Sequence, residues 1–391
     1  MAVQPGLPIA LLAAAGFLGS AGTRIVDSIL HPIATDFGVG VPDLWVVIAA
    51  FTLPYGLAQI VLGPVGDRFG KLRVILGALV LYALFTGTCA LAADLMSLTL
   101  LRACAGAASA GLIPVSMAYI GDAVSYDRRQ VTLSKFLTGT VLAQTLAGPL
   151  GGVFGEYLGW RGVFLVLSGL AVLLAVAFAW RMSSLPDRRS PGRMLDPANY
   201  LAMARRPFAR FVLLAATLDG AVLGGCFPFV APYLHEHFGL NYAHVGLVLA
   251  CFGLGAYLYT VFARQMIARL GEAGMVLAGG LLMSGALLLA VAGSAWTWFV
   301  PVELMLGLGF FTLHGVLQAR ATEMLPAARG TAVATFACVL FVGQSLGALL
   351  IGFAIARLGY RPAFVLDAAS VLLLGCWLWW MLRRPPSTVH A

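Results

Sequence analysis

Charged side chains are scarce in this sequence. Only 10% of its 391 residues are Asp, Glu, Lys or Arg, whereas 61% are hydrophobic. A typical soluble domain is about 25% charged, and so little polar surface cannot cover a water-soluble globule of this size. Lipid is therefore the predicted solvent for most of the chain, and the composition leaves no room for a sizeable soluble domain.

Motifs of nucleotide, metal and redox chemistry are also absent. The sequence has no GxxxxGKS phosphate loop and no HExxH zinc motif, which excludes nucleotide-driven transport by this chain alone. Its six cysteines lie in apolar stretches without CxxC spacing or a neighbouring histidine cluster, so we interpret them as small buried residues. We predict no metal and no cofactor. Because no nucleophile and base are clustered either, we predict that the protein is not an enzyme.

What the sequence has in abundance is long hydrophobic runs. A membrane-spanning helix needs about 20 mainly apolar residues. The predicted spans are residues 8–36, 42–66, 72–93, 96–121, 131–157, 161–182, 208–235, 242–268, 273–294, 296–322, 328–356 and 361–382. The predicted fold class is an all-α membrane protein, with twelve transmembrane helices in two parallel six-helix repeats around a central cavity.

The basic residues are distributed unevenly between the loops. If the N-terminus is inside, most of the 24 Lys and Arg residues fall in inside loops, whereas Arg161, Arg357 and Arg361 fall outside. The positive-inside rule then puts both termini in the cytoplasm, and we expect a multi-pass protein of a bacterial inner membrane. The net charge of +8 is therefore a topology signal, and no nucleic-acid partner is predicted.

An internal duplication is visible at an offset of 200 or 201 residues. Arg102 aligns with Glu303 and Asp122 aligns with Glu323, and matched charges are harder to obtain by chance than matched Leu or Ala. An even number of spans in each half keeps the halves parallel, a plan in which transporters hold their solute near the midplane between the repeats. The predicted domains are an N-terminal six-helix bundle (1–182), a cytoplasmic linker with a short amphipathic helix (183–207) and a C-terminal six-helix bundle (208–391).

The turn between the second and third spans carries the strongest motif, Gly63-Pro-Val-Gly66-Asp67-Arg68-Phe69-Gly70-Lys71. Its glycines permit a tight turn and a close approach of helices. The string resembles the cytoplasmic signature of the major facilitator superfamily, and the chain resembles that family over essentially its full length. Within the family it resembles the twelve-span drug:proton antiporter group.

The family resemblance assigns a role to this turn. The signature maps onto Gly63, Asp67, Arg68, Gly70 and Lys71, and its partner acid at the inner end of the fourth span maps onto Asp122. The resemblance implies that these residues form a charge relay that latches the halves in the outward-open state. The second-half copy has Ala268 at the position of Asp67, so we expect a weaker latch there.

Arg102, in the fourth span, resembles the arginine of the family's RxxxG motif, which is linked to proton coupling. An arginine in the hydrocarbon layer costs about 2.5–3.5 kcal/mol on insertion scales, so we expect it to have a partner. Helical rise puts Asp27 of the first span at a matching depth, while Arg24, one turn away, competes for Asp27. Asp27 is either a proton site tuned by Arg102 and by burial or the acid of a permanent structural ion pair.

Two acids of the second half are further candidates for proton coupling. Glu303 occupies the repeat position of Arg102, and Asp219 lies near the middle of the seventh span without a basic residue nearby in sequence. A buried carboxyl of this kind is protonated, paired across helices or hydrated. Each is therefore a proton carrier, a cation-attracting group or a neutral structural acid. Asp367 is interpreted as structural, and His314, a substrate-site candidate, is either a proton shuttle or a satisfied buried histidine.

The fifth span carries Gly148-Pro149-Leu-Gly151-Gly152, which resembles the family's antiporter motif with one residue missing and so supports export less than a full match. Gln144 and Gln344 occupy equivalent repeat positions, where they bond either a solute or a neighbouring helix. The aromatic residues expected to line the cavity are Phe51, Tyr55, Phe227 and Phe229.

These features predict secondary active transport, namely proton-coupled efflux of a small organic, drug-like or amphiphilic molecule by alternating access. Few polar groups are available to line the cavity, which favours an apolar or cationic solute over a sugar. The alternative is a proton-linked sugar or metabolite permease that exports or imports its solute. The expected partners are the small-molecule substrate, protons and membrane lipid, and we expect a monomer.

Overall fold

The computed structural model describes residues 9–124, 126–182 and 197–383, and no strand occurs within these ranges. The first half contains α1 (Ile9–Arg24), η1 (Ile25–Ile29), α2 (Leu30–Phe37), η2 (Val41–Leu44), α3 (Trp45–Phe69), α4 (Lys71–Cys89), α5 (Leu95–Ser109), α6 (Pro114–Ala123) and α7 (Tyr126–Met182). The rest comprises α8 (Pro197–Arg205), α9 (Pro207–Phe238), α10 (Tyr242–Ala292), η3 (Trp296–Trp298), α11 (Phe299–Ala321), η4 (Pro326–Ala328), α12 (Arg329–Leu358) and α13 (Tyr360–Arg383). The predicted fold class, an all-α membrane protein, is confirmed. Most of the predicted linker, residues 183–196, lies outside the described residues.

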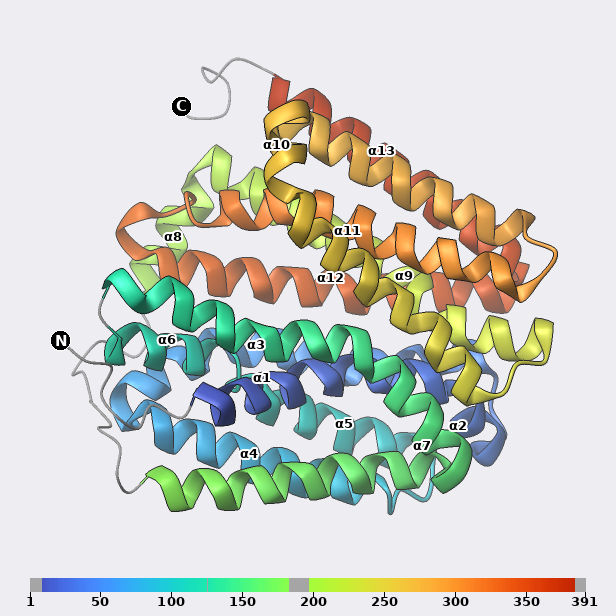
Figure 1. The fold of residues 1–391 in the computed structure, drawn as a ribbon, viewed down its shortest axis with the longest axis horizontal. Coiled ribbons are helices and arrows are strands. Elements are labelled where there is room, and N and C mark those ends of the chain that lie inside the picture. The colour runs from blue at the N-terminus through green and yellow to red at the C-terminus, as the bar shows by residue number, and fades with distance from the viewer. Residues whose placement is uncertain (1–8, 125, 183–196, 384–391) are drawn as a thin grey trace.

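Ten helical segments of the described chain are long and apolar enough to cross a membrane. Those within α7 and α10 hold 52 and 51 residues, which is about 75 Å of helix and more than twice the thickness of a bilayer core. Each bends back at a glycine with positive φ, Gly159 (φ 70°) and Gly271 (φ 62°), and both hairpins are visible in Figure 1. Counted as separate arms, the described helices supply twelve spans, in agreement with the predicted number.

The sequence duplication extends to backbone conformation. Among the described residues, positive φ occurs only at six glycines, which form three pairs with offsets of 200 or 201: Gly38 with Gly239, Gly70 with Gly271, and Gly159 with Gly359. Close helix packing is repeated as well. A Cβ on Gly106 would lie 2.2 Å from the carbonyl oxygen of Phe51, and one on Gly307 would lie 2.0 Å from that of Phe252. The same turns and the same helix contact therefore recur in both halves.

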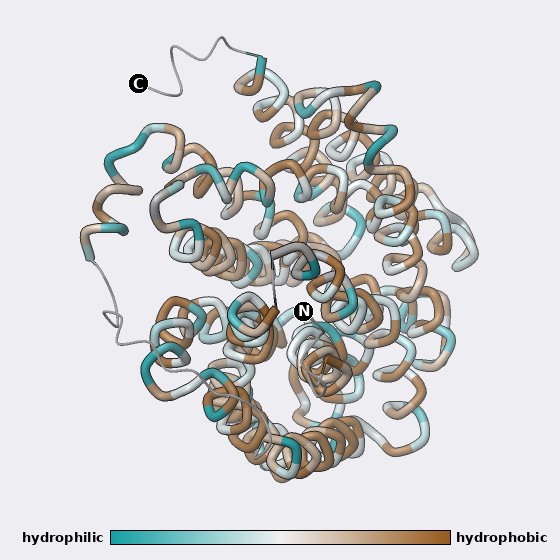
Figure 2. The backbone as a smooth tube through the Cα atoms, turned by 60° about the vertical axis from the view of Figure 1, so that its left-hand side comes forward, coloured by the Kyte–Doolittle hydropathy of each residue, from teal (hydrophilic) through white to brown (hydrophobic). Residues whose placement is uncertain are grey.

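Figure 1 shows the two halves as neighbouring bundles, α1–α7 below and α9–α13 above. Across their boundary, α3 packs against α12 and α7 packs against α10. Leu84, Leu173 and Leu373 are examples of large side chains that are more than half exposed, and Figure 2 shows hydrophobic residues along the outer as well as the inner sides of the helices. Such an apolar exterior is expected of helices that face lipid.

The first residues of α1 and the last residues of α13 lie toward the same side of the bundle in Figure 1. We call the end where α1 begins and α13 ends the terminal end. The opposite end, with the turns at Gly38 and Gly239, is the distal end.

Candidate functional site

The first span is interrupted in its middle by the 3-10 turn η1, between α1 and α2. Pro32 has no N–H to donate to the carbonyl of Ser28, which favours a break just before it. The interruption holds Arg24 and Asp27 together, with Arg24 Nη1 at 3.8 Å from Asp27 Oδ2 and side-chain exposures of only 12% and 2%. A buried ion pair therefore sits where the first span departs from a regular helix.

The expected pair of Asp27 and Arg102 is not formed. Arg102 Nη2 instead donates to the carbonyl oxygen of Gly22 at 3.1 Å, and its guanidinium lies 4.2 Å from the centre of the Phe51 ring. Arg102 still interacts electrostatically with Asp27. The depth argument was right about proximity and wrong about the direct partner, because Arg24 lies only three residues from Asp27 on the same segment.

Arg24 also reaches across the boundary between the halves. Its guanidinium lies 4.3 Å from the ring centre of Phe227 and 5.8 Å from that of Phe252, on α9 and α10. It interacts electrostatically with Glu303 on α11 as well as with Asp27. Glu303 is fully buried, and neither of its carboxyl oxygens has a hydrogen-bond partner among the described residues. Arg24 is thus ion-paired with Asp27 and interacts at longer range with Glu303, a buried acid of the other half.

A second buried pair lies within the second half. His314 Nδ1 is 2.7 Å from Asp219 Oδ2, and the two side chains are 10% and 2% exposed. The imidazole is stacked on Phe310, with ring centres 4.9 Å apart. Asp219 was expected to be protonated, paired across helices or hydrated, and in the structure it is paired across helices, from α9 to α11. Its partner is 95 residues away in the sequence, so sequence proximity gave no indication of it.

The aromatic residues expected to line a cavity are buried in helix contacts. Phe51 packs under the guanidinium of Arg102, and Tyr55 meets Phe341 of α12 edge to face at 4.7 Å between ring centres. Phe227 contacts Phe252 in the same way at 4.7 Å. Phe229 is fully buried. Tyr55 and Phe227 therefore lie at the boundary between the halves, where a solute site is expected. Phe51 lies within the first half, against the guanidinium of Arg102.

Polar side chains also occur at this boundary. Gln344 of α12 is buried and Gln144 of α7 is half-buried. Thr52 Oγ1 lies 2.8 Å from Ser345 Oγ, which joins α3 to α12 directly. The sequence analysis missed this last contact because single Ser and Thr residues in an apolar helix are common and carry no functional signal.

The turn of residues 63–71, between α3 and α4 at the terminal end, forms a compact charge cluster. Lys71 Nζ lies 2.6 Å from Asp67 Oδ1 and 2.7 Å from Asp122 Oδ2, so three of the predicted latch residues are brought together. Gly70 has φ 99°, a conformation that L side chains rarely adopt, whereas a Cβ on Gly63 would meet open space. Arg68 lies over the ring of Phe69 at 5.6 Å. These contacts join α3, α4 and α6 and lie within the first half.

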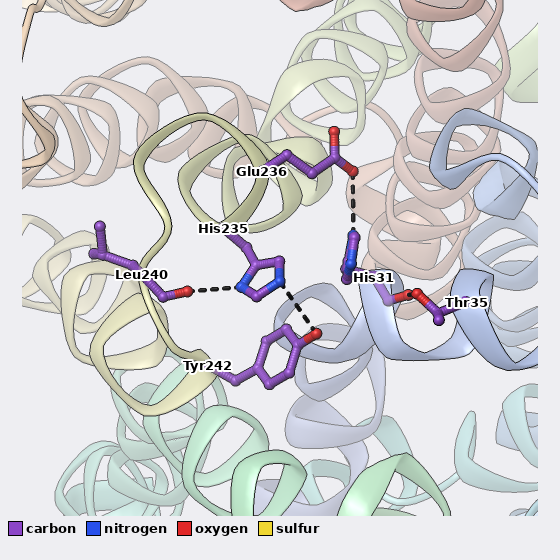
Figure 3. A network of polar contacts seen from close by, with 6 residues as sticks. All are labelled: His31, Thr35, His235, Glu236, Leu240 and Tyr242. Carbon is purple, nitrogen blue, oxygen red and sulfur yellow. Dashed lines mark hydrogen bonds and ion pairs between the residues drawn. The ribbon is translucent and has the colours of Figure 1, made fainter.

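A polar cluster missed by the sequence analysis lies at the distal end (Figure 3). His31 Nδ1 of α2 is 3.3 Å from Glu236 Oε1 of α9, so this contact joins the two halves. The rings of His31 and His235 lie 4.4 Å apart. Histidines at 31 and 235 are far apart in sequence, and only the packing of α2 against α9 brings them together. Within the described residues, no group of three or more His, Cys, Asp or Glu residues is arranged to hold a metal ion.

Comparisons with known proteins agree on one family. The family model described as Major Facilitator Superfamily matches residues 12–218 and 212–391. "Transcription regulatory protein OpdE" of Pseudomonas aeruginosa is 28% identical over 357 residues, covering 88% of this chain and 86% of that protein. "Purine ribonucleoside efflux pump NepI" of Salmonella typhimurium is 27% identical over 354 residues, with coverages of 88% and 86%.

A solved structure shares the fold. It is a bacterial homolog of the human lysosomal transporter Spinster, in an inward-facing and occupied conformation. The two chains superimpose with a TM-score of 0.78 over 98% of each, at 17% sequence identity. At that identity the match describes the fold and not the solute.

Proposed function

The chain belongs to the major facilitator superfamily of membrane transporters, and from this premise we propose that it couples the efflux of a small organic molecule to proton entry by alternating access. The observation that carries the proposal is the cluster at the boundary of the halves, in which Arg24 pairs with Asp27 and interacts electrostatically with Glu303. Ionisable residues at membrane depth are costly and mark substrate or proton pathways.

The charges suggest how a proton is exchanged. An unpaired carboxylate without hydrogen-bond donors is costly in an apolar environment, and Glu303 is buried without such a donor among the described residues. In our proposal Glu303 holds a proton while Arg24 pairs with Asp27, and Asp27 takes one when Arg24 turns to Glu303. Because the two acids lie in different halves, the exchange favours one relative position of the halves over the other.

Asp219 and His314 are the second element of the proposal. A carboxyl and an imidazole 2.7 Å apart are within hydrogen-bond distance, so a proton can pass directly between them. We assign this pair to proton transfer within the second half. His314 then contacts Asp219 rather than the solute.

The orientation proposed here has the terminal end in the cytoplasm of a bacterial inner membrane. Lys71, Arg73, Arg205 and Arg320 all lie near that end, which accords with the positive-inside rule. At the distal end the halves are in contact through His31 and Glu236. The conformation is therefore proposed to be closed toward the outside.

The solute is proposed to be an amphiphilic or drug-like molecule with a planar ring. Phe227 and Phe252 flank the guanidinium of Arg24, and aromatic faces of this kind stack on planar solutes. A metabolite exporter is the second candidate, since NepI, 27% identical, is named for purine ribonucleoside efflux. Both candidates use the same site and the same coupling, and we propose that the protein acts as a monomer.

Uptake into everted membrane vesicles with an acidic interior tests the proposal. The panel contains purine ribonucleosides, pyrimidine ribonucleosides, cationic dyes and uncharged amphiphiles. Asp27→Asn and Glu303→Gln are expected to reduce proton-driven uptake about tenfold or more while leaving solute binding by thermal shift detectable. Asp367→Asn is the matched control, because this buried acid accepts a hydrogen bond from the Cys226 N–H at 3.2 Å and Asn retains an acceptor. Full proton-driven uptake in both Asp27→Asn and Glu303→Gln would refute the coupling assignment.

A further inference from the structure

The distal cluster, defined as His31, His235, Glu236 and Tyr242, closes the boundary between the halves at the distal end. His31 belongs to α2 of the first half, His235 and Glu236 end α9, and Tyr242 begins α10. Figure 3 shows the His31 and His235 imidazoles side by side, with Glu236 above His31 and Tyr242 below His235. The rings of His235 and Tyr242 are stacked at 4.5 Å between centres. The cluster therefore contains two imidazoles and one carboxylate, and it is His31 that contacts the carboxylate of Glu236.

The hydrogen bonds of His235 go to uncharged groups of the second half. Its Nδ1 lies 2.7 Å from the carbonyl oxygen of Leu240, and a carbonyl only accepts, so Nδ1 carries the proton. Its Nε2 lies 3.4 Å from the Tyr242 hydroxyl, which donates to it. A second proton on His235 would reverse that contact, with Nε2 donating to the hydroxyl, and would put a positive charge beside the His31 ring, whose centre is 4.4 Å away.

His31, unlike His235, faces a carboxylate. Its Nδ1 faces Glu236 Oε1 at 3.3 Å, and both side chains are about one-third exposed, at 29% and 34%. A cleft of about 430 Å³ lined by His31, Thr35, Asp36, Trp160, Arg161 and Tyr242 lies beside the ring. Protons therefore have access to His31, and the group nearest to it is an anion of the other half.

The other charged groups around His31 do not offset this attraction. Asp36, on the same helix, is paired with Arg161 of α7 and accepts a hydrogen bond from Trp160 Nε1 at 3.1 Å. Glu156 of α7 accepts a hydrogen bond from the Tyr242 backbone N–H at 2.9 Å, which adds negative charge nearby. Tyr360 of α13 interacts with Glu236 and is uncharged at neutral pH.

We propose that His31 is a proton-sensing gate residue: its protonation from the distal side strengthens the pair with Glu236 and holds the two halves closed at that end. The closed form binds the proton more tightly than the open form, so acid favours the closed form. Because histidines gain their charge between about pH 8 and pH 5, the effect is expected to grow over that range as the pH falls. The proposal rests on the proposed function only for its place in the cycle, in which external protons close the gate after solute release.

Distance measurement between spin labels tests the gate without transport. Ala93 and Ser294 are exposed distal residues of the two halves, and they are replaced by labelled cysteines in a chain whose six native cysteines are changed to serine or alanine. Between pH 8 and pH 5 the closed-to-open ratio is expected to rise about two- to fivefold, the range of a partly exposed ion pair.

Three variants make the outcome specific to His31. His31→Gln and Glu236→Gln are expected to lose most of this pH response, and the double variant is expected to lose no more than either single one. His235→Gln, the matched control, is expected to keep the response because the hydrogen bonds of His235 go to the Leu240 carbonyl and the Tyr242 hydroxyl and not to a carboxylate of the other half. The gate is refuted if His31→Gln retains the full response or if the parent chain has none. Because no solute or gradient is present, such a failure is independent of the vesicle experiment on Asp27 and Glu303.

Discussion

The two halves of this transporter carry opposite charges at one repeat position, Arg102 and Glu303, in otherwise matching surroundings. Each residue lies four positions before a glycine that packs on a phenylalanine backbone, Gly106 on Phe51 and Gly307 on Phe252. Arg102 has its contacts inside its own half, where Nη2 donates to the Gly22 carbonyl and the guanidinium lies over the Phe51 ring, while its Nε has no hydrogen-bond partner among the described residues. Glu303 has no hydrogen-bond partner in the described part of its half and interacts with Arg24 of the other half. The repeat supplies the scaffold, and at this position the second half has an acid that interacts electrostatically with a cation of the first half.

The terminal ends of the halves differ in the same manner. Lys71 begins α4 and is held by Asp67 and Asp122, which offset the cost of a cation at a helix N-terminus. The equivalent residue of the second half is Glu272, whose Oε2 accepts from Arg320 Nε at 2.8 Å. The second half therefore replaces a lysine between two acids with one glutamate–arginine pair. The weaker latch expected from Ala268 stays a prediction.

The largest expected effect comes from removing the cation of Arg24. Arg24→Leu leaves Asp27 and Glu303 buried without the guanidinium, and breaking a buried pair in this way costs about 3–5 kcal/mol. We expect a lower melting temperature in detergent and a loss of proton-driven uptake of about tenfold or more. The double variant Arg24→Leu with Asp27→Leu should recover stability but not uptake. A single variant as stable as the parent would mean that Arg24 does not compensate these acids.

The next prediction concerns the glycine contact that occurs at the equivalent position inside each half, Gly106 on Phe51 and Gly307 on Phe252. Gly106→Ala and Gly307→Ala put a Cβ at about the same distance from a backbone oxygen, 2.2 Å and 2.0 Å, so neither site accommodates it without a helix shift. Overpacking of this kind costs about 1–3 kcal/mol. Equal losses of thermal stability are expected, with Gly77→Ala as the control because a Cβ there meets open space. A clearly unequal pair of losses would contradict the equivalence of the two contacts.

The charge clusters of the terminal end give a smaller difference. Lys71 is buried and has two acid partners, so Lys71→Met is expected to cost about 1 kcal/mol at low salt. Glu272→Gln affects an acid that is 44% exposed, and a smaller loss is expected. Thermal unfolding at low and high salt measures both, because screening weakens exposed pairs more than buried ones. A larger loss for Glu272→Gln than for Lys71→Met would reverse the comparison.

The sequence predicted the fold and the types of site residue more fully than it predicted their partners. Hydrophobic runs define spans because lipid requires them, and the family resemblance implied that Asp67 and Lys71 belong to one charge relay, where the structure pairs them at 2.6 Å. Asp27 was expected to pair with Arg102, yet it pairs with Arg24 because the turn η1 interrupts the first span there. The partners of Asp219 and His31 lie 95 and 205 residues away. Which helices meet depends on tertiary packing, and no local pattern encodes it.

The smallest predicted effect is a pH dependence that only one half should have. Asp94 caps the N-terminus of α5 and accepts the Ser97 N–H at 2.7 Å, which lowers the pKa of Asp94 below its ordinary value. Its repeat equivalent, Ala295, provides no side-chain cap to η3. The stabilisation by Asp94 is therefore present above the ordinary aspartate pKa of about 3.9 and is lost as the pH falls through the lowered value.

Melting temperatures measured from pH 6 down to pH 3 test this cap. Asp94→Asn keeps the hydrogen-bond acceptor, so its melting temperature should fall less than that of the parent chain as the pH is lowered. Asp94→Ala removes the cap and should lower the melting temperature throughout this pH range. Ala295→Asp should give the second half a cap of its own, because an acceptor at that position faces the free N–H groups of the next turn. An Asp94→Asn profile identical to that of the parent chain would show that the cap contributes nothing that depends on pH.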